Sequence, residues 1–231
     1  MIRLPTNAAL LLDLDGTLID IAPTPDSVVV PPDLPPSLTR LRDHLGGALA
    51  IVSGRPIAQI DALLPGIATA TAGEHGYAVR HSPDGIAVCA AVEPVPPDWV
   101  SAAKDWVSGN PGAIFEPKAR GFVLHFRLAP QIGDGFRAKL AALLADNPHY
   151  RIGGAHMAWE VKPRGIDKGR AVREIMAHPP FAGRLPVFIG DDITDEDGMA
   201  EATRMGGFGL RVPADFANAA AVRAWLAALG A

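Results

Sequence analysis

The chain alternates short runs of apolar residues with longer segments in which apolar residues recur every three or four positions. The runs are typical of buried strands and the longer segments of helices that bury one face. In the first third a Pro-Asp-Gly sequence also predicts a hairpin. Strands are predicted at residues 8–13, 48–54 and 67–73, helices at 36–46 and 56–64, and the hairpin at 77–90.

The last third repeats this rhythm. Helices are predicted at residues 168–178, 195–205 and 217–229, and strands at 185–192 and 207–212. Strands that are separated by helices indicate a parallel sheet with helices on both faces. Both ends of the chain therefore contribute to one α/β, doubly wound parallel-sheet (Rossmann-like) core.

The middle of the chain follows a different order, in which a helix and two strands occur twice. The helices are predicted at residues 99–109 and 131–146, and the strands at 113–118, 121–127, 149–154 and 156–162. This order predicts a small antiparallel sheet with two helices on one face. We therefore predict an inserted α+β cap domain at residues 95–162, and a core formed by residues 1–94 and 163–231. The two linkers near the cap boundaries should let the cap close over a substrate.

Composition narrows the class of protein. The chain has 231 residues, 48% of them hydrophobic, and a net charge of −4. It has no basic surplus, so we do not expect a nucleic-acid partner. It has one cysteine, Cys89, no apolar segment long enough for a membrane helix and no signal-peptide pattern. We expect a cytoplasmic protein without membrane or nucleic-acid partners, and a monomer.

The stretch "ALLLDLDGTLID" ends the first strand with Asp13 and Asp15. In a regular strand, residues two apart share a face, and two buried carboxylates are costly unless a cation neutralises them. The alternative is a strand that simply ends in an Asp-Gly turn.

Polar residues also follow other predicted strands, where ligands of doubly wound sheets bind. Ser53, Gly54 and Arg55 precede a helix whose N-terminus could hold a phosphate, although Ser53 could instead be that helix's N-cap. Asp191 and Asp192 directly follow "VFIG". Adjacent carboxylates without paired Cys or His favour Mg²⁺ as the cation. Thr194 and Asp197 fit a capping box at the start of the next helix. That interpretation accounts for the acidic residues 195–197 but not for Asp191 and Asp192.

Two lysines lie where the chain returns to the core. Lys162 and Lys168 could both be solvated, but a lysine near the second acidic cluster could neutralise a bound phosphate. Together these parts indicate phosphoryl transfer to an aspartate. Asp13 would attack phosphorus, Asp15 would transfer protons, and Mg²⁺ would stabilise the developing charge.

The motifs "DLDGTL", "SGR", "KG" and "GDD", in this order, resemble those of the haloacid dehalogenase-like phosphatases. The stretches "PTPDSVVVP", "GEHG", "FEPKARGFVLHFR", "EVKPRGIDKG" and "FIGDDITDED" narrow the resemblance to the trehalose-6-phosphate phosphatase family. The generic form of the first motif, without an aromatic residue between its aspartates, adds nothing to this choice. The resemblance implies Mg²⁺-dependent hydrolysis of trehalose 6-phosphate through an aspartyl-phosphate.

The resemblance also implies roles for individual residues. Catalytic roles fall to Asp13 and Asp15, phosphate binding to Ser53, Gly54 and Lys168, and metal binding to Asp13, Asp15, Asp191 and Asp192, with Asp195 an alternative to Asp192. Substrate binding falls to Arg55 and His75 in the core and to Glu116, Lys118, Arg127 and Glu160 in the cap. Glu116 and Lys118 could instead form a salt-bridged surface pair. We assign no role to Glu74. His125 could contact the sugar or be a packed strand residue, and we favour packing.

Other functions remain open at this point. The same chemistry could act on sucrose 6-phosphate or a glycosyl-phosphoglycerate, and a phosphomutase would use the same core. A non-catalytic domain that binds a sugar phosphate as a regulatory signal is a further alternative, although Asp13, Asp15, Lys168 and Asp191 are all present.

Overall fold

The computed structural model describes residues 2–67, 69–145, 147–155 and 157–230, and the chain divides into two compact units. The first, which we call the core unit, comprises Met1–Ala90 and Asp167–Ala231, and the second, the inserted unit, comprises Ala91–Ile166. The insertion begins and ends a few residues outside the range of 95–162 that the sequence indicated. Ala68, Asp146 and His156, which belong to predicted elements, lie outside the described residues.

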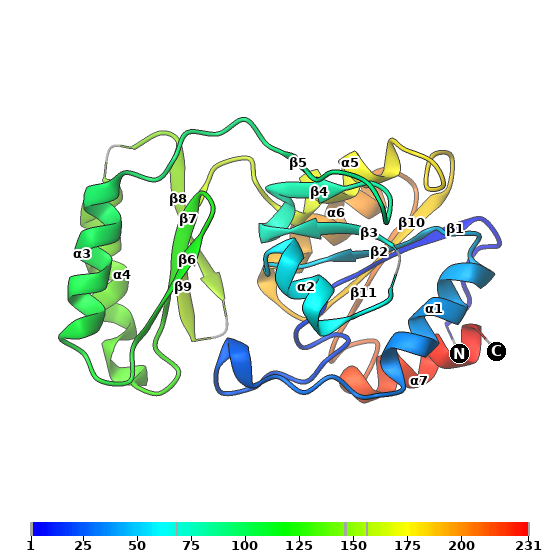
Figure 1. The fold of residues 1–231 in the computed structure, drawn as a ribbon, viewed down its shortest axis with the longest axis horizontal. Coiled ribbons are helices and arrows are strands. Elements are labelled where there is room, and N and C mark those ends of the chain that lie inside the picture. Colours follow the sequence, from blue (N-terminus) through cyan, green and yellow to red (C-terminus); the bar gives the residue numbers. More distant parts are fainter. Residues whose placement is uncertain (1, 68, 146, 156, 231) are drawn as a thin grey trace. The chain divides into compact units, whose positions relative to one another are not determined.

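The core unit contains a seven-stranded sheet in the order β11-β10-β1-β2-β3-β4-β5 (Figure 1). The first five of these strands are parallel, and β4 and β5 form an antiparallel hairpin at one edge. The predicted parallel sheet and hairpin are both confirmed. The strands are β1 (Ala8–Leu12), β2 (Leu49–Val52), β3 (Ala70–Gly73), β4 (Ala78–Arg80), β5 (Val88–Cys89), β10 (Leu185–Gly190) and β11 (Phe208–Arg211).

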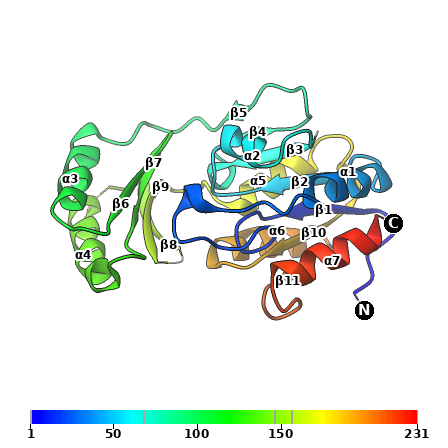
Figure 2. The same ribbon diagram turned by 60° about the horizontal axis from the view of Figure 1, so that its bottom comes forward.

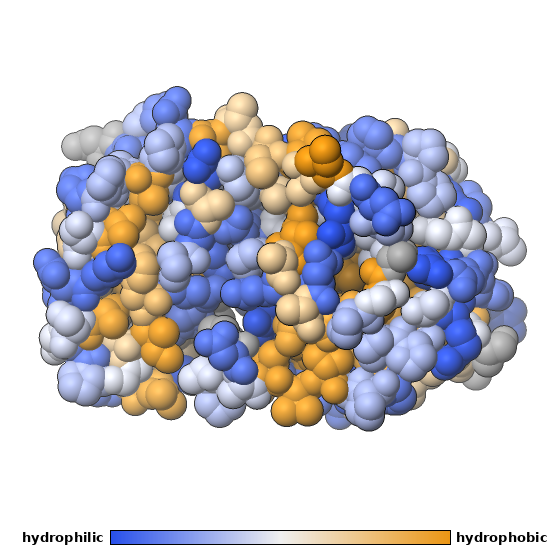
Figure 3. Space-filling view, in the orientation of Figure 1, coloured by the Kyte–Doolittle hydropathy of each residue, from blue (hydrophilic) through white to orange (hydrophobic). Residues whose placement is uncertain are grey.

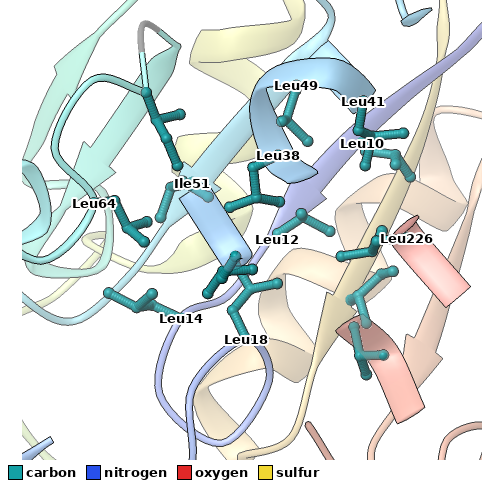
Figure 4. Close-up of a cluster of buried hydrophobic side chains, with 14 of the residues drawn as sticks. Leu10, Leu12, Leu14, Leu18, Leu38, Leu41, Leu49, Ile51, Leu64 and Leu226 are labelled. Carbon is teal, nitrogen blue, oxygen red and sulfur yellow. The ribbon is translucent and has the colours of Figure 1, made fainter. Parts of the chain in front are cut away.

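Helices cover both faces of this sheet, because its interior strand β1 is apolar on both sides. Leu10 and Leu12 of β1 face one apolar cluster, which includes residues of α1 and α7 (Figure 4). Ala9 and Leu11 face the other cluster, which includes residues of α5 and α6. The helices are α1 (Leu34–His44), α2 (Ile57–Leu63), α5 (Lys168–Met176), α6 (Glu196–Arg204) and α7 (Ala219–Leu229), with short 3₁₀ helices at η1 (Pro25–Ser27), η2 (Glu74–Gly76) and η4 (Ile193–Asp195).

The inserted unit contains a four-stranded antiparallel sheet in the order β6-β7-β9-β8. Figure 2 shows both of its helices on the same side of that sheet. Figure 3 shows an apolar band along the inserted unit, between its helices and its sheet. The predicted order, in which a helix followed by two strands occurs twice, is confirmed. The elements are α3 (Pro97–Ser108), β6 (Ile114–Lys118), β7 (Gly121–His125), η3 (Pro130–Ile132), α4 (Gly133–Leu144), β8 (Tyr150–Ala155) and β9 (Ala158–Pro163).

Among the described residues, no helix combines the length and apolar character that crossing a bilayer requires.

Candidate active site

The polar residues that follow β1, β2 and β10 meet at one edge of the core sheet. Leu12 pairs with Ile51 of β2 on one side and with Ile189 of β10 on the other. Because these three strands are parallel, the residues just beyond them converge at their carboxyl ends, where doubly wound sheets bind ligands. The register therefore explains why residues far apart in the sequence form one site.

Three carboxylates gather around one ammonium group at this edge. Asp13, Asp191 and Asp195 each place an oxygen within 4.8 Å of the others. Lys168 Nζ donates to Asp13 Oδ1 at 2.6 Å and to Asp195 Oδ1 at 2.5 Å. Asp13, Lys168 and Asp195 are buried. One lysine cannot balance three carboxylates, two of them buried and that of Asp191 half-buried, so the cluster has a deficit of positive charge.

The pKa values within this cluster reflect the deficit. Burial, then the charges of Asp195 and Asp191, raise the pKa of Asp13 well above its ordinary range, although Lys168 opposes them. Burial and the charge of Asp195 likewise raise the pKa of Asp191 to about 6. Burial favours neutral Lys168, but the charges of Asp13 and Asp195 outweigh it and raise the lysine pKa. A cation beside the carboxylates would favour their ionised forms.

The loop after β1 is shaped to admit the second acid. Gly16 has a φ of +84°, and a Cβ added there would lie 2.1 Å from Asp191 Oδ2. Any side chain at this position would therefore displace Asp191. Thr17 Oγ1 lies 3.2 Å from Asp13 Oδ2 and 3.4 Å from Asp191 Oδ1. The Gly-Thr pair of the first motif thus holds the two carboxylates side by side.

Asp195, rather than Asp192, completes the acidic cluster. The side chain of Asp192 accepts a hydrogen bond from the Ile193 amide at the start of η4. Asp195 Oδ2 accepts from the amides of Asp191 and Asp192 at 3.0 and 2.9 Å. The capping box predicted for Thr194 and Asp197 is wrong. The helical turn starts earlier, at η4, so Asp192 and Asp195 form the box instead.

Arg55 contacts Asp15 in this structure. Its Nε and Nη2 donate to the two carboxylate oxygens of Asp15, each at 2.7 Å. Ser53 is buried, and its Oγ accepts from the Arg55 amide at 3.2 Å. Ser53 does not cap α2, whose N-cap is Pro56 without a side-chain hydrogen bond. The "SGR" motif therefore links the predicted phosphate-binding serine to the predicted acid/base.

His75 lies against Gly54. A Cβ added to Gly54 would be 2.7 Å from the His75 ring. The backbone of His75 has a φ of 56°, and its amide donates to the Ser53 carbonyl at 3.0 Å. The structure thus brings together the predicted phosphate-binding Gly54 and the predicted substrate-binding His75.

In the inserted unit, the face of the sheet that is not covered by α3 and α4 carries a group of charged side chains. Strand pairing aligns Glu116 with Val123 and Val123 with Glu160, so Glu116 and Glu160 lie on this face. The next rung aligns Lys118 with Gly121. The alternation of strand residues therefore places three of the four predicted sugar-binding residues of the cap on one surface. The fourth, Arg127, follows β7 and is half-buried.

Glu116 is held by two donors on this face. Lys118 Nζ lies 2.5 Å from Glu116 Oε1, and His125 Nε2 lies 2.7 Å from Glu116 Oε2. Burial would raise the pKa of Glu116, but the hydrogen bond from His125 and the charge of Lys118 lower it to about 2. The His125 side chain is largely covered, with 18% exposed, as expected of a packed strand residue, and its ring also contacts a carboxylate. The salt bridge of Glu116 with Lys118 exists, but only 9% of the Lys118 side chain is exposed, so the pair is not a solvated surface pair.

A second pair repeats this spacing on β9. Lys162 Nζ lies 3.2 Å from Glu160 Oε2, and both side chains are buried, with 7% of each exposed. The interpretation of Lys162 as a solvated lysine is therefore wrong. Two Glu-x-Lys sequences, "FEPK" and "WEVK", thus place carboxylate–ammonium pairs on strands that flank β7. This repeat was visible in the sequence and could have pointed to Lys162.

Comparison with known proteins gives a consistent assignment. Residues 11–223 match the family model of trehalose-phosphatase. A probable trehalose-phosphate phosphatase of Sinorhizobium fredii is 40% identical over 211 residues, which cover 89% of this chain and 78% of that protein. The trehalose-6-phosphate phosphatase of Escherichia coli is 37% identical over 219 residues, covering 91% of this chain and 79% of that protein.

The fold is also shared with solved structures. The C-terminal domain of trehalose-6-phosphate phosphatase from Candida albicans superposes with a TM-score of 0.83, covering 97% of this chain and 92% of that one at 20% identity. Structural similarity at this identity supports the fold alone, whereas the family match rests on sequence. The chain therefore belongs to the trehalose-phosphatase family of phosphoric monoester hydrolases and has the haloacid dehalogenase-like fold.

Proposed function

We propose that this chain hydrolyses trehalose 6-phosphate to trehalose and inorganic phosphate, with Mg²⁺ as cofactor and an aspartyl-phosphate at Asp13 as intermediate. The observation that carries this proposal is the buried Asp13, held by Lys168 beside Asp191 and Asp195. The names of the sequence relatives support the choice of substrate.

The acidic cluster fits a divalent cation. Three carboxylates opposed by one ammonium leave two negative charges uncompensated. Oxygen donors without sulfur or imidazole favour Mg²⁺ among the common divalent ions. The carboxylates of Asp13, Asp191 and Asp195 would hold the ion, and Asp15 would contribute its backbone carbonyl oxygen. When bound, the ion would neutralise the cluster and stabilise charge on the transferring phosphoryl group.

The first step forms the covalent intermediate. A carboxylate oxygen of Asp13 attacks phosphorus, and the bond between phosphorus and the sugar oxygen breaks. Asp15 gives a proton to the departing sugar oxygen. Arg55 occupies both oxygens of Asp15 in this structure, so this pair must open before Asp15 can donate. Lys168 and Ser53 would bind the oxygens of the phosphoryl group.

The second step releases phosphate. Water attacks phosphorus, Asp15 takes a proton from that water, and the bond between Asp13 and phosphorus breaks. This step restores Asp13 as a carboxylate and Asp15 as a proton donor. The covalent intermediate at Asp13 divides a difficult displacement into two steps, and Asp15 serves the first as acid and the second as base.

We assign phosphate chemistry to the core unit and sugar recognition to the inserted unit. The first holds the acidic cluster, and the second presents Glu116, Lys118 and Glu160 on one face. Carboxylates and ammonium groups at fixed positions suit the hydroxyls of a sugar, because an analogue that lacks a hydroxyl leaves such groups unpaired.

The test is phosphate release from a panel of sugar phosphates by the purified protein. We expect trehalose 6-phosphate to give the highest kcat/KM with Mg²⁺ and no turnover in chelator. A clear preference for sucrose 6-phosphate or a glycosyl-phosphoglycerate would contradict the proposed substrate but not the chemistry. Absence of turnover on every member of the panel would contradict both.

A further inference from the structure

We propose that His125 is a positioning residue for sugar recognition, acting through the carboxylate of Glu116. This inference rests on the proposed function, since it assigns to His125 the task of fixing one of the groups that would contact the sugar. The sequence analysis favoured packing for His125 over a direct sugar contact, and it assigned the residue no role through Glu116.

The hairpin of β6 and β7 brings the two residues together. Ala119 and Arg120 form its turn, so Lys118 pairs with Gly121 and Ile114 with His125. Strand alternation then places His125 on the same face as Glu116. The separation of 2.7 Å between His125 Nε2 and Glu116 Oε2 is that of a strong, charge-assisted hydrogen bond.

The two donors of Glu116 divide its carboxylate between them. Lys118 takes Oε1 and His125 takes Oε2. A lysine alone is a flexible point charge and leaves the carboxylate free to rotate, whereas a second donor on the other oxygen fixes its plane. Each oxygen retains a further lone pair, so a fixed carboxylate can still accept hydrogen bonds from sugar hydroxyls.

The ionisation of Glu116 decides the direction of the bond with His125. The pKa of Glu116 is held at about 2, so it is an ionised acceptor at neutral pH. The imidazole must therefore carry its proton on Nε2. Nε2 is therefore committed to the neighbouring carboxylate.

Three substitutions at one position separate this role from simple packing. The amide nitrogen of Gln lies close to the position of Nε2, whereas that of Asn lies closer to Nδ1. His125→Gln can therefore keep the hydrogen bond, and His125→Asn and His125→Ala cannot. We expect the last two to lower kcat/KM for trehalose 6-phosphate about tenfold, mainly through KM, and His125→Gln to stay within about threefold of the wild type.

Two controls make the result decisive. Hydrolysis of p-nitrophenyl phosphate, which presents no sugar, should be unchanged in all three variants. In a Glu116→Gln background, His125→Ala should cost less than about twofold, since its effect passes through the ionised Glu116 carboxylate. Equal losses in His125→Gln and His125→Ala, equal losses on both substrates, or full loss in the Glu116→Gln background would each overturn the inference.

The same experiment separates the inference from the function on which it rests. If the wild type does not hydrolyse trehalose 6-phosphate, the proposed function fails and this role for His125 fails with it. If the wild type is active and His125→Ala matches it, the proposed function stands and only the inference is overturned.

Discussion

The core unit and the inserted unit each contain a cluster of acidic and basic side chains, buried in the core and half-buried in the inserted unit, but their charges balance differently. In the core, Asp13, Asp191 and Asp195 surround one ammonium group, and the pKa values of the first two are raised. In the inserted unit, Glu116 lies between two donors and its pKa is lowered to about 2. The first cluster needs further positive charge, and the second does not.

This difference indicates what each cluster can bind. A site with an excess of buried negative charge is costly until a cation arrives, so it suits a divalent ion and, with that ion, a phosphate. A site whose carboxylates already have ammonium or imidazole partners offers oriented hydrogen bonds without net charge. Such a site suits a neutral polyhydroxyl ligand. The proposed substrate, a sugar phosphate, combines both chemical groups.

The largest expected effect is the loss of the nucleophile. Asp13→Asn keeps the size of the side chain but removes its charge, so turnover should fall by several powers of ten, on the order of 10⁴. Steady-state phosphate release measures this loss, and circular dichroism checks the fold. Activity within about tenfold of the wild type, in protein shown to be free of wild-type contamination, would contradict the mechanism.

The next effect separates two neighbouring acids. Asp195→Asn should weaken activation by Mg²⁺ at least tenfold, because it removes a charge from the cluster. Asp192→Asn is the matched control, since the Asp192 side chain caps η4 and lies outside the cluster. It should change Mg²⁺ activation by less than about threefold, because an amide oxygen can also cap a helix. A Mg²⁺ titration of both variants is the measurement, and the reverse order of effects would place the ion elsewhere.

A smaller loss of activity is expected from a substitution on the face of the inserted unit's sheet that α3 and α4 do not cover. Lys118→Ala should lower kcat/KM for trehalose 6-phosphate by about tenfold, on the order of 1.4 kcal/mol. Lys139→Ala in α4 is the matched control, because Lys139 lies over the ring of Trp106 in the helical layer. Equal kinetics of the two variants would show that Lys118 has no special part in sugar recognition.

The smallest effect concerns stability and pH. In metal-free protein the pKa of Asp191 is about 6 against an ordinary 3.8, so the folded chain binds more protons than the unfolded chain between these values. The stability from this group is present below the lower value and is lost as the pH rises through the higher one. Thermal melts in chelator should thus show the melting temperature falling across this range.

The control for these melts is Mg²⁺ itself. The ion binds the ionised carboxylates, so it should remove or reverse the fall. Glu116 acts in the opposite direction: its pKa is lowered from 4.5 to about 2, so its stabilisation is complete only above about pH 4.5 and is lost as the pH falls toward 2. A melting temperature that falls equally with and without Mg²⁺ would assign the titration to groups outside the acidic cluster.

The helices and strands could be predicted from the sequence because hydrophobic period and chain order agree throughout. The acidic cluster could be predicted only in part. Asp192 and Asp195 are both plausible from local sequence, and the choice depends on where the helical turn begins. That start is set by the hydrogen bonds that Asp195 accepts from the amides of Asp191 and Asp192, which no propensity reveals.

The contact of His125 with Glu116 shows a different limit. A two-residue turn at Ala119 and Arg120 would have fixed the hairpin register and placed both side chains on one face. The residue types alone could not show that the imidazole reaches the carboxylate. Nor could they show that Arg55 pairs with Asp15, since side chains of this length reach several alternatives.

The most direct test of the contrast between the two clusters compares the loss of activity caused by chelation with the loss caused by Glu116→Ala, each on two substrates. Hydrolysis of trehalose 6-phosphate and of p-nitrophenyl phosphate is measured for the wild type with Mg²⁺, the wild type in chelator, and Glu116→Ala with Mg²⁺. We expect chelation to abolish turnover of both substrates, and Glu116→Ala to lower kcat/KM at least tenfold for the sugar phosphate alone. Turnover in chelator, or an equal loss on both substrates in Glu116→Ala, would contradict the assignment of metal-dependent phosphate chemistry to the core unit and of sugar recognition to the inserted unit.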